Sequence, residues 1–214
     1  SDKTRLIFIA NPNNPTGTYL TEQALSEFLA VLPTHVICVL DEAYFEYVSK
    51  DDYPSSIAWL EQYPNLVITR TFSKAYGLAG LRVGYSLSSP EMADILNRVR
   101  QPFNNNALAL AAAEVALSDV DYLHKSVALN NAGMQQLKEA FTELGLSWIE
   151  SVGNFITVDF NRDASVINTA LLHKGVIVRP VANYDMPNHL RISIGTLAEN
   201  EFFIRALKAV LADV

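Results

Sequence analysis

The chain has 214 residues, half of them hydrophobic, which is enough to bury the core of one or two domains. Its formal net charge of −7 argues against a nucleic-acid surface, because such a surface needs clustered lysine and arginine. No apolar run approaches the roughly 20 residues that a membrane span needs. A single cysteine, Cys38, excludes an internal disulfide framework. These features favour a cytoplasmic enzyme with neither a nucleic-acid nor a membrane partner.

The first half of the sequence is typical of an α/β fold. Continuous apolar runs predict buried strands at 6–10, 36–40, 66–69 and 83–87. A helix is expected from Thr21, which is a good N-cap, to about Leu32, and Pro33 ends it. Continuous apolar strands separated by helices predict a mainly parallel sheet with helices on both faces.

The second half has a different pattern. A helix is expected to begin at Pro90, another to cover 107–117, and a long one to run from Tyr122 to about Leu144, with Gly145 as its C-cap. The tail resembles a small α+β unit with strands at 155–160, where the residues alternate, 176–179 and 190–194 and a helix at 197–211. We therefore expect part of a large domain at 1–118, a connecting helix at 119–144 and a small carboxyl-terminal domain at 145–214.

The segment that begins at Thr71 has the clearest chemical meaning. Lys74 follows the apolar run 66–69, so it lies at the predicted carboxyl end of a strand. Ser73 and Thr71 precede it, and Arg82 follows among glycines. A lysine in this position can be a covalent nucleophile, and hydroxyl groups with an arginine suit a phosphate. The segment therefore predicts a Schiff-base lysine with a cofactor phosphate bound beside it.

Polar residues also follow the other two predicted parallel strands. Asn14 lies in the loop after the first strand, and Asp41 ends the second. Because α/β sheets bind ligands at the carboxyl ends of their strands, we expect these residues to converge with Lys74 on one edge. Taken singly, Asn14 is an ordinary turn residue, Asp41 with Glu42 could be a solvated acidic turn, and a lone lysine is usually a surface charge.

Four motifs in order identify a family resemblance. The motifs are Asn14-Pro15-Thr16-Gly17, Asp41-Glu42-Ala43-Tyr44, Ser73-Lys74-Ala75 with Arg82, and Leu190-Arg191-Ile192-Ser193-Ile194-Gly195-Thr196. Together they resemble the fold type I pyridoxal-phosphate aminotransferases, most closely the histidinol-phosphate aminotransferase branch. The resemblance covers the whole chain. It implies an α/β fold that contains part of the large domain of such a transferase and the small α+β domain.

The resemblance implies a role for each cofactor-binding residue. Lys74 would form a Schiff base with pyridoxal 5'-phosphate and then move the substrate proton, while Asp41 would pair with the pyridine nitrogen. Asn14 and Tyr44 would hydrogen-bond the phenolic oxygen. The cofactor phosphate would be held by Thr71, Ser73 and Arg82. Tyr44 could instead be an ordinary packing aromatic.

The resemblance also implies how the substrate is bound. Arg191 would hold a substrate carboxylate or phosphate by a planar fork, and Arg179, at another strand end, is a second candidate. Either arginine could instead form a structural salt bridge. The four histidines have no metal-ligand spacing, so no metal site is expected.

The implied reaction is amino transfer from histidinol phosphate to 2-oxoglutarate, giving imidazole-acetol phosphate and glutamate in histidine biosynthesis. The same scaffold also serves aromatic amino-acid aminotransferases and a threonine-phosphate decarboxylase. Members of the family are usually homodimers, and they carry an upstream part that completes the phosphate site. Because the sequence opens on a strand at Leu6, we expect a carboxyl-terminal fragment that binds the cofactor poorly and tends to aggregate. An inactive fragment is thus the alternative from another class.

Overall fold

The computed structural model describes residues 2–213, which form two compact units. Unit 1 contains the chain up to Asn13 and the stretch from Tyr19 to His124. Unit 2 contains the short segment Asn14–Thr18 and the chain from Lys125 onward. The segment 14–18 thus belongs with residues that lie more than a hundred positions away in the sequence.

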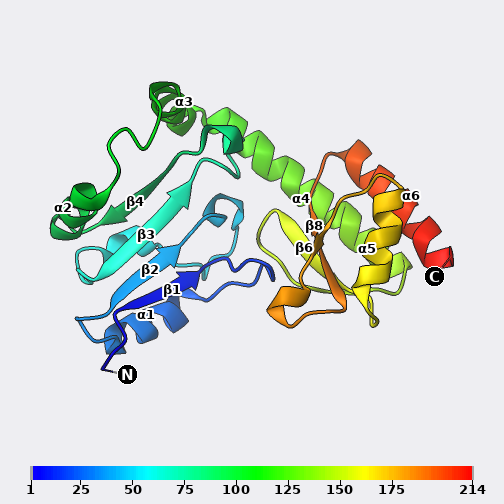
Figure 1. Ribbon diagram of the computed structural model, residues 1–214, viewed down its shortest axis with the longest axis horizontal. Helices are drawn as coiled ribbons and strands as arrows, with labels where there is room; N and C mark the ends of the chain where they lie inside the picture. Colours follow the sequence, from blue (N-terminus) through cyan, green and yellow to red (C-terminus); the bar gives the residue numbers. More distant parts are fainter. Residues whose placement is uncertain (1, 214) are drawn as a thin grey trace. The chain divides into compact units, whose positions relative to one another are not determined.

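The core of unit 1 is a four-stranded sheet whose spatial order follows the chain (Figure 1). Its strands are β1 (Leu6–Ala10), β2 (Ile37–Asp41), β3 (Leu66–Thr71) and β4 (Gly84–Ser88). The first three strands pair in parallel and β4 is antiparallel to β3. This confirms the predicted mainly parallel sheet, with β2 and β4 each shifted by one residue.

Helix α1 (Glu22–Val31) covers one face of this sheet. Thr21 caps it as predicted, since its side chain accepts a hydrogen bond of 3.2 Å from the Ala24 amide. Leu25 and Leu29 are buried on the helix and pack in one cluster with strand residues from β2 and β3, namely Cys38, Leu40, Leu66 and Ile68. The α1 helix therefore covers one face of the sheet, and the Asp41 side chain points to the other face.

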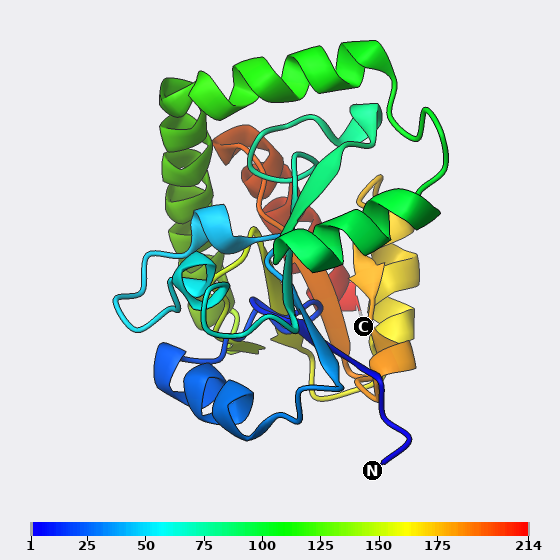
Figure 2. The same cartoon turned by 90° about the vertical axis from the view of Figure 1, so that its left-hand side faces the viewer.

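Two further helices and three short 3₁₀ turns complete unit 1. Helix α2 (Pro90–Val99) contacts β4, as Figure 2 also shows. A second cluster joins Phe72 and Val83, which flank the Lys74 loop, to Ala109 and Ala113 of α3. The remaining elements are α3 (Ala107–Ser118), η1 (Phe45–Tyr47), η2 (Ser56–Trp59) and η3 (Ala79–Leu81).

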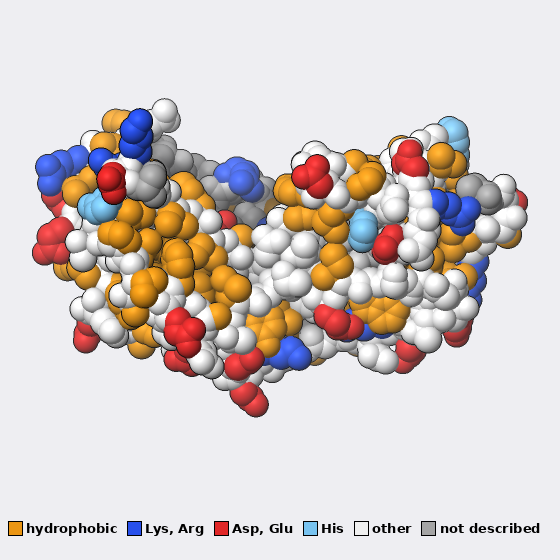
Figure 3. Space-filling view, turned by 90° about the horizontal axis from the view of Figure 1, so that it is seen from below, with side chains coloured by type: hydrophobic (Ala, Val, Ile, Leu, Met, Phe, Trp, Pro, Cys, Tyr) orange, Lys and Arg blue, Asp and Glu red, His pale blue; other side chains and the backbone are white. Residues whose placement is uncertain are grey.

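Unit 1 also exposes large apolar side chains. On β1, Leu6 is 52% exposed and Phe8 is 72% exposed, and Phe103 is 97% exposed. Figure 3 shows hydrophobic side chains gathered on the surface of this unit. Exposed apolar area of this kind is typical of a surface that contacts more protein.

Unit 2 is an antiparallel sheet with helices packed on it, in the spatial order β5-β6-β8-β7. Met134, Leu137 and Phe141 of the long helix α4 share a core with the strands and with α5 and α6. The elements are α4 (Val120–Glu143), which begins in unit 1, β5 (Ser147–Ile149), β6 (Phe155–Asp159), α5 (Ala164–His173), β7 (Arg179–Pro180), η4 (Ala182–Tyr184), β8 (His189–Ser193) and α6 (Leu197–Asp213).

Three features of unit 2 differ from the sequence-based expectations. The strand at 155–160 was predicted from alternation, yet all residues from Phe155 to Val158 are buried. The reason is that the segment 14–18 reaches the Thr157 side chain, which donates a hydrogen bond to the Pro15 carbonyl. The strand predicted at 176–179 is reduced to Arg179 and Pro180, and β5 and α5 were not predicted at all.

Candidate active site

Asp41 ends β2, and the Lys74 segment follows the carboxyl end of the neighbouring strand β3. Asp41 pairs in register with Ala10 of β1 and Thr69 of β3. The three strands are parallel, so their carboxyl ends share one edge. Of the three residues predicted to converge, Asp41 and Lys74 thus follow neighbouring strand ends in unit 1, whereas Asn14 belongs to unit 2.

Backbone bonds fix Asp41 on both sides. Its carbonyl accepts a hydrogen bond of 2.9 Å from the Asn11 amide, and the next amide, that of Glu42, donates to the Thr69 carbonyl at 2.9 Å. The Asp41 carboxylate accepts a hydrogen bond of 3.1 Å from the Ala43 amide and is otherwise exposed. An exposed carboxylate on a rigid strand end can accept a proton or a hydrogen bond from a ligand.

Lys74 lies over an aromatic ring. Its Nζ is 5.1 Å from the centroid of the Tyr44 ring, a cation–π distance, and Tyr44 is only 5% exposed. The lysine itself is half-buried. The ring face therefore limits the directions that the amine can take, which suits a side chain that must meet one bound ligand.

The three residues proposed for a phosphate lie together beside Lys74. The Ser73 amide donates to Thr71 Oγ1 at 3.1 Å, and Arg82 Nη1 donates to Ser73 Oγ at 3.3 Å and to the Ala79 carbonyl at 2.9 Å. Arg82 has a left-handed backbone with φ of 52°. Two hydroxyl groups and a guanidinium, all linked through Ser73, form a donor set that matches phosphate oxygens.

The remaining candidates lie in unit 2. Arg191 on β8 donates a hydrogen bond from Nη1 to Asn14 Oδ1, and its guanidinium lies 4.9 Å from the centroid of the Phe155 ring. Arg191 Nε is buried and makes no hydrogen bond within the described residues. Arg179 on β7 pairs in register with Arg191, so the two residues are direct cross-strand neighbours. Asn14, Arg191 and Arg179 thus form one group.

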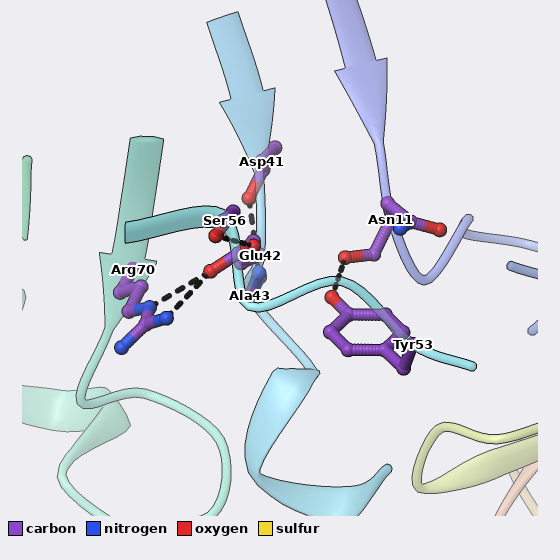
Figure 4. Close-up of polar contacts among 7 residues, drawn as sticks. All are labelled: Asn11, Asp41, Glu42, Ala43, Tyr53, Ser56 and Arg70. Atoms are coloured by element: carbon purple, nitrogen blue, oxygen red, sulfur yellow. Dashed lines mark hydrogen bonds and ion pairs between the residues drawn. The ribbon is translucent and has the colours of Figure 1, made fainter. Parts of the chain in front are cut away.

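A buried polar network lies directly behind Asp41, and sequence analysis did not single it out (Figure 4). Glu42 forms an ion pair with Arg70, with Oε2 2.8 Å from Nη2, and its Oε1 accepts a hydrogen bond from Ser56 Oγ. Burial lowers the pKa of Arg70, but the hydrogen bond and ion pair with Glu42 outweigh it and raise that pKa overall. The available signal was an arginine directly after the predicted buried strand 66–69, because a charge that becomes buried needs a partner.

Glu46 is a second carboxyl group beside this network. Both of its carboxylate oxygens are buried and without a hydrogen-bond partner among the described residues. Burial raises the pKa of Glu46 to about 7, against weaker opposing effects of its own backbone and of Arg70. Near neutral pH this side chain therefore holds a proton for part of the time.

Asn11 and Tyr53 anchor the loop that leaves β1. Asn11 is fully buried, and its side chain accepts a hydrogen bond from the Leu20 amide at 2.7 Å. The Tyr53 hydroxyl donates to the Asn11 carbonyl at 2.5 Å (Figure 4). Burial raises the pKa of Tyr53, so this hydroxyl stays a donor at any ordinary pH. These bonds hold the two ends of the loop, Asn11 and Leu20, within unit 1.

The described residues contain neither a metal site nor a membrane-spanning helix. No group of histidine, cysteine, aspartate or glutamate there has the arrangement of a metal site. Within the same residues, no helix combines the length and apolar character needed to cross a membrane.

The fold and the site place the chain in a known family. It belongs to the aminotransferase class I and II family, whose model matches residues 1–207. It is 64% identical over 211 residues to histidinol-phosphate aminotransferase 2 of Pseudomonas fluorescens strain Pf-5, covering 99% of this chain and 57% of that protein. It is 58% identical over 208 residues to histidinol-phosphate aminotransferase 1 of Idiomarina loihiensis, covering 97% of this chain and 57% of that protein.

A solved structure supports the same relationship. Histidinol-phosphate aminotransferase from Sinorhizobium meliloti, in complex with pyridoxal-5'-phosphate, superposes with a TM-score of 0.89 at 35% identity. The match covers 98% of this chain and 58% of that one. The chain therefore spans a little more than half of the length of the relatives it matches.

Proposed function

We propose that this chain carries the cofactor site and the anion-binding arginines of a pyridoxal-phosphate-dependent transaminase that acts on histidinol phosphate and 2-oxoglutarate. The observation that carries the proposal is the group formed by Lys74, the phosphate-type donors beside it and Asp41 on the adjacent strand. The 64% identity to a protein named histidinol-phosphate aminotransferase supports the choice of substrate.

The residues present fit pyridoxal 5'-phosphate. Thr71, Ser73 and Arg82 would hold its phosphate, and Asp41 would accept a hydrogen bond from its pyridine nitrogen. Tyr44 and Asn14 would hydrogen-bond its phenolic oxygen. When bound, the cofactor supplies an electron sink for the charge that develops on the substrate carbon.

Lys74 would perform two tasks with one amine. It would hold the cofactor covalently. Once that bond is broken, the free amine would take the proton from the substrate Cα and later donate it to a different atom of the reacting molecule. The Tyr44 ring under the amine would keep Nζ directed at that carbon. Asp41 would keep a proton on the pyridine nitrogen by offering it a carboxylate.

Arg191 and Arg179 would bind the anionic groups of both substrates. Histidinol phosphate carries a phosphate and 2-oxoglutarate carries carboxylates, and one guanidinium fork can accept either anion. Two arginines in direct cross-strand register give a site of high positive charge. The buried Nε of Arg191 supplies an N–H that has no hydrogen-bond partner among the described residues.

The covalent role of Lys74 can be tested directly. Full-length protein is incubated with pyridoxal phosphate, reduced with borohydride, digested and analysed by mass spectrometry. We expect the pyridoxyl group on Lys74, no label in Lys74→Ala, and unchanged labelling in the control Lys50→Ala, which alters an exposed lysine. A label on another residue, or none, would contradict the proposal.

The reaction can be separated from its alternatives by a product assay. Histidinol phosphate, phenylalanine and tyrosine are each offered with 2-oxoglutarate, and glutamate is measured. We expect glutamate to form fastest with histidinol phosphate. Faster turnover of phenylalanine or tyrosine would favour an aromatic aminotransferase, and release of carbon dioxide from threonine phosphate would favour the decarboxylase.

We also propose a cytoplasmic homodimer for the full-length protein. The exposed apolar side chains of unit 1, such as Phe8 and Phe103, support the view that this surface packs against further protein. Sedimentation of the full-length protein tests the dimer, and a monomer at micromolar concentration would contradict it.

A further inference from the structure

The buried ion pair between Glu42 and Arg70 lies immediately next to the site residues in the sequence. Glu42 follows Asp41, and Arg70 precedes Thr71. The exposed fraction is 0% for the Glu42 side chain and 12% for Arg70. A carboxylate removed from water to this degree is expensive unless its partners are complete and well aligned, so its geometry is tightly specified.

The carboxylate of Glu42 has such partners. Oε2 accepts a hydrogen bond from Arg70 Nε at 2.9 Å and forms an ion pair with Arg70 Nη2 at 2.8 Å, and Oε1 accepts a hydrogen bond from Ser56 Oγ. The Arg70 guanidinium also lies over the Phe45 ring, 3.6 Å from its centroid. One carboxylate therefore connects the ends of β2 and β3 with the turns η1 and η2.

The pair is separated from the site by the alternation of side chains along a strand. Neighbouring residues point to opposite faces, so Glu42 and Arg70 lie behind the strand ends that carry Asp41 and Thr71. Figure 4 shows the Glu42 carboxylate directed at Arg70 and Ser56, whereas the Asp41 carboxylate turns to the Ala43 amide. The pair is therefore placed to act on the site without touching a ligand.

We propose that Glu42 and Arg70 are positioning residues that set the spacing between Asp41 and the Thr71–Lys74 segment. This inference rests on the proposed function, because that spacing matters only if both parts hold one ligand. Backbone pairing between β2 and β3 reaches Glu42 through its amide, and the side-chain pair adds directional bonds at the point where backbone pairing stops. A site of this kind must be held to within roughly half an ångström.

The experiment compares three variants of the full-length protein with the wild type. Glu42→Gln keeps the shape and removes the charge. The double variant Glu42→Met with Arg70→Met replaces the pair by apolar groups, a change that buried ion pairs often tolerate without loss of stability. Leu29→Ala is the matched control, because it weakens the packing of α1 on the same sheet and leaves the pair intact.

Two readouts are measured on each folded variant. The first is hydrogen–deuterium exchange of the cofactor-free protein, over peptides that contain 41–43 and 71–74. The second is the pyridoxal phosphate concentration needed to label half of Lys74 before borohydride reduction. We expect faster exchange in both peptides and a requirement for about 10- to 100-fold more pyridoxal phosphate, the range seen when an orienting residue behind a binding site is removed. Leu29→Ala should change neither the exchange rate of these two peptides nor the pyridoxal phosphate requirement by a comparable amount.

If Glu42→Gln does not fold, the double variant tests whether the pair positions Asp41 and the Thr71–Lys74 segment. The proposal is overturned if either readout of the folded double variant equals the wild type, since the pair would then only stabilise the fold. If wild-type Lys74 takes no label, the proposed function fails, and the exchange readout of the cofactor-free protein still decides whether the pair positions the two segments.

Discussion

Glu46 provides a test of the buried polar cluster that needs no cofactor. The charged and titratable groups that influence it are Arg70 and Glu42, and its own charge acts on Tyr53 and Tyr76. The pKa of both tyrosines and that of Arg70 are raised above their ordinary values, so none of these three groups titrates near neutral pH. Glu42 forms its buried ion pair with Arg70 in both the wild type and Glu46→Gln. A change in stability between mildly acidic and mildly basic pH that Glu46→Gln removes can therefore be assigned to Glu46.

The sign follows from the direction of the shift. The pKa of Glu46 rises from 4.5 to about 7 on folding, so between these values the folded state binds more protons than the unfolded state. Stability from this group is therefore full below about 4.5 and is lost as pH rises through about 7. One pKa unit corresponds to about 1.4 kcal/mol, which gives a loss of about 3 kcal/mol across the window.

The assay is urea unfolding of the wild type and Glu46→Gln, followed by circular dichroism at several pH values from about 5 to about 8. The glutamine cannot ionise, so the unfolding free energy of the wild type should fall by about 2.5 kcal/mol relative to that of the variant over this range. The control Glu61→Gln alters an exposed carboxylate and should run parallel to the wild type. Parallel pH curves for the wild type and Glu46→Gln would refute the reasoning.

Three further changes have expected outcomes. Gly17→Ala should lower the thermal midpoint and reduce soluble yield, because a Cβ would lie 2.0 Å from Ser151 Oγ and the backbone φ is +76°; an unchanged midpoint would contradict the packing of the 14–18 segment. Phe141→Ala should destabilise unit 2 by about 3–5 kcal/mol in urea unfolding, since the ring is fully buried in its core; a loss below about 1 kcal/mol would argue against that core. Arg191→Lys should raise the KM for anionic substrates at least about tenfold, because a lysine cannot form the planar fork; an unchanged KM would exclude Arg191 from substrate binding.

Much of unit 1 could be predicted from the sequence because its signals are local. Apolar runs marked the parallel strands, and the residue that follows each run necessarily lies at a strand end. The sequence alone therefore predicts that Asp41 and Lys74 follow strand ends on one edge of the sheet. The Thr21 cap was equally readable, since an N-cap depends on a few neighbouring residues.

The contacts behind the site could not be predicted in the same way. The pairing of Glu42 with Arg70 depends on the register between β2 and β3, where Asp41 lies opposite Thr69. A sequence shows that each strand exists but not which residues face each other across it. Likewise, the partial strand at Arg179 and the burial of Thr157 are decided by chain segments distant in sequence.

Contacts between residues distant in sequence also hold the segment Asn14–Thr18 in unit 2. The Val152 amide donates to the Gly17 carbonyl at 2.9 Å, Thr157 Oγ1 donates to the Pro15 carbonyl at 2.5 Å, and Arg191 bonds Asn14. These three hydrogen bonds join the segment to unit 2, of which it is a part. Because Asn14 and Arg191 share a hydrogen bond, a substrate anion that draws Arg191 away would also change the environment of Asn14. In the proposed function this links the group that binds the substrate anion to a group that binds the cofactor oxygen, within a single unit.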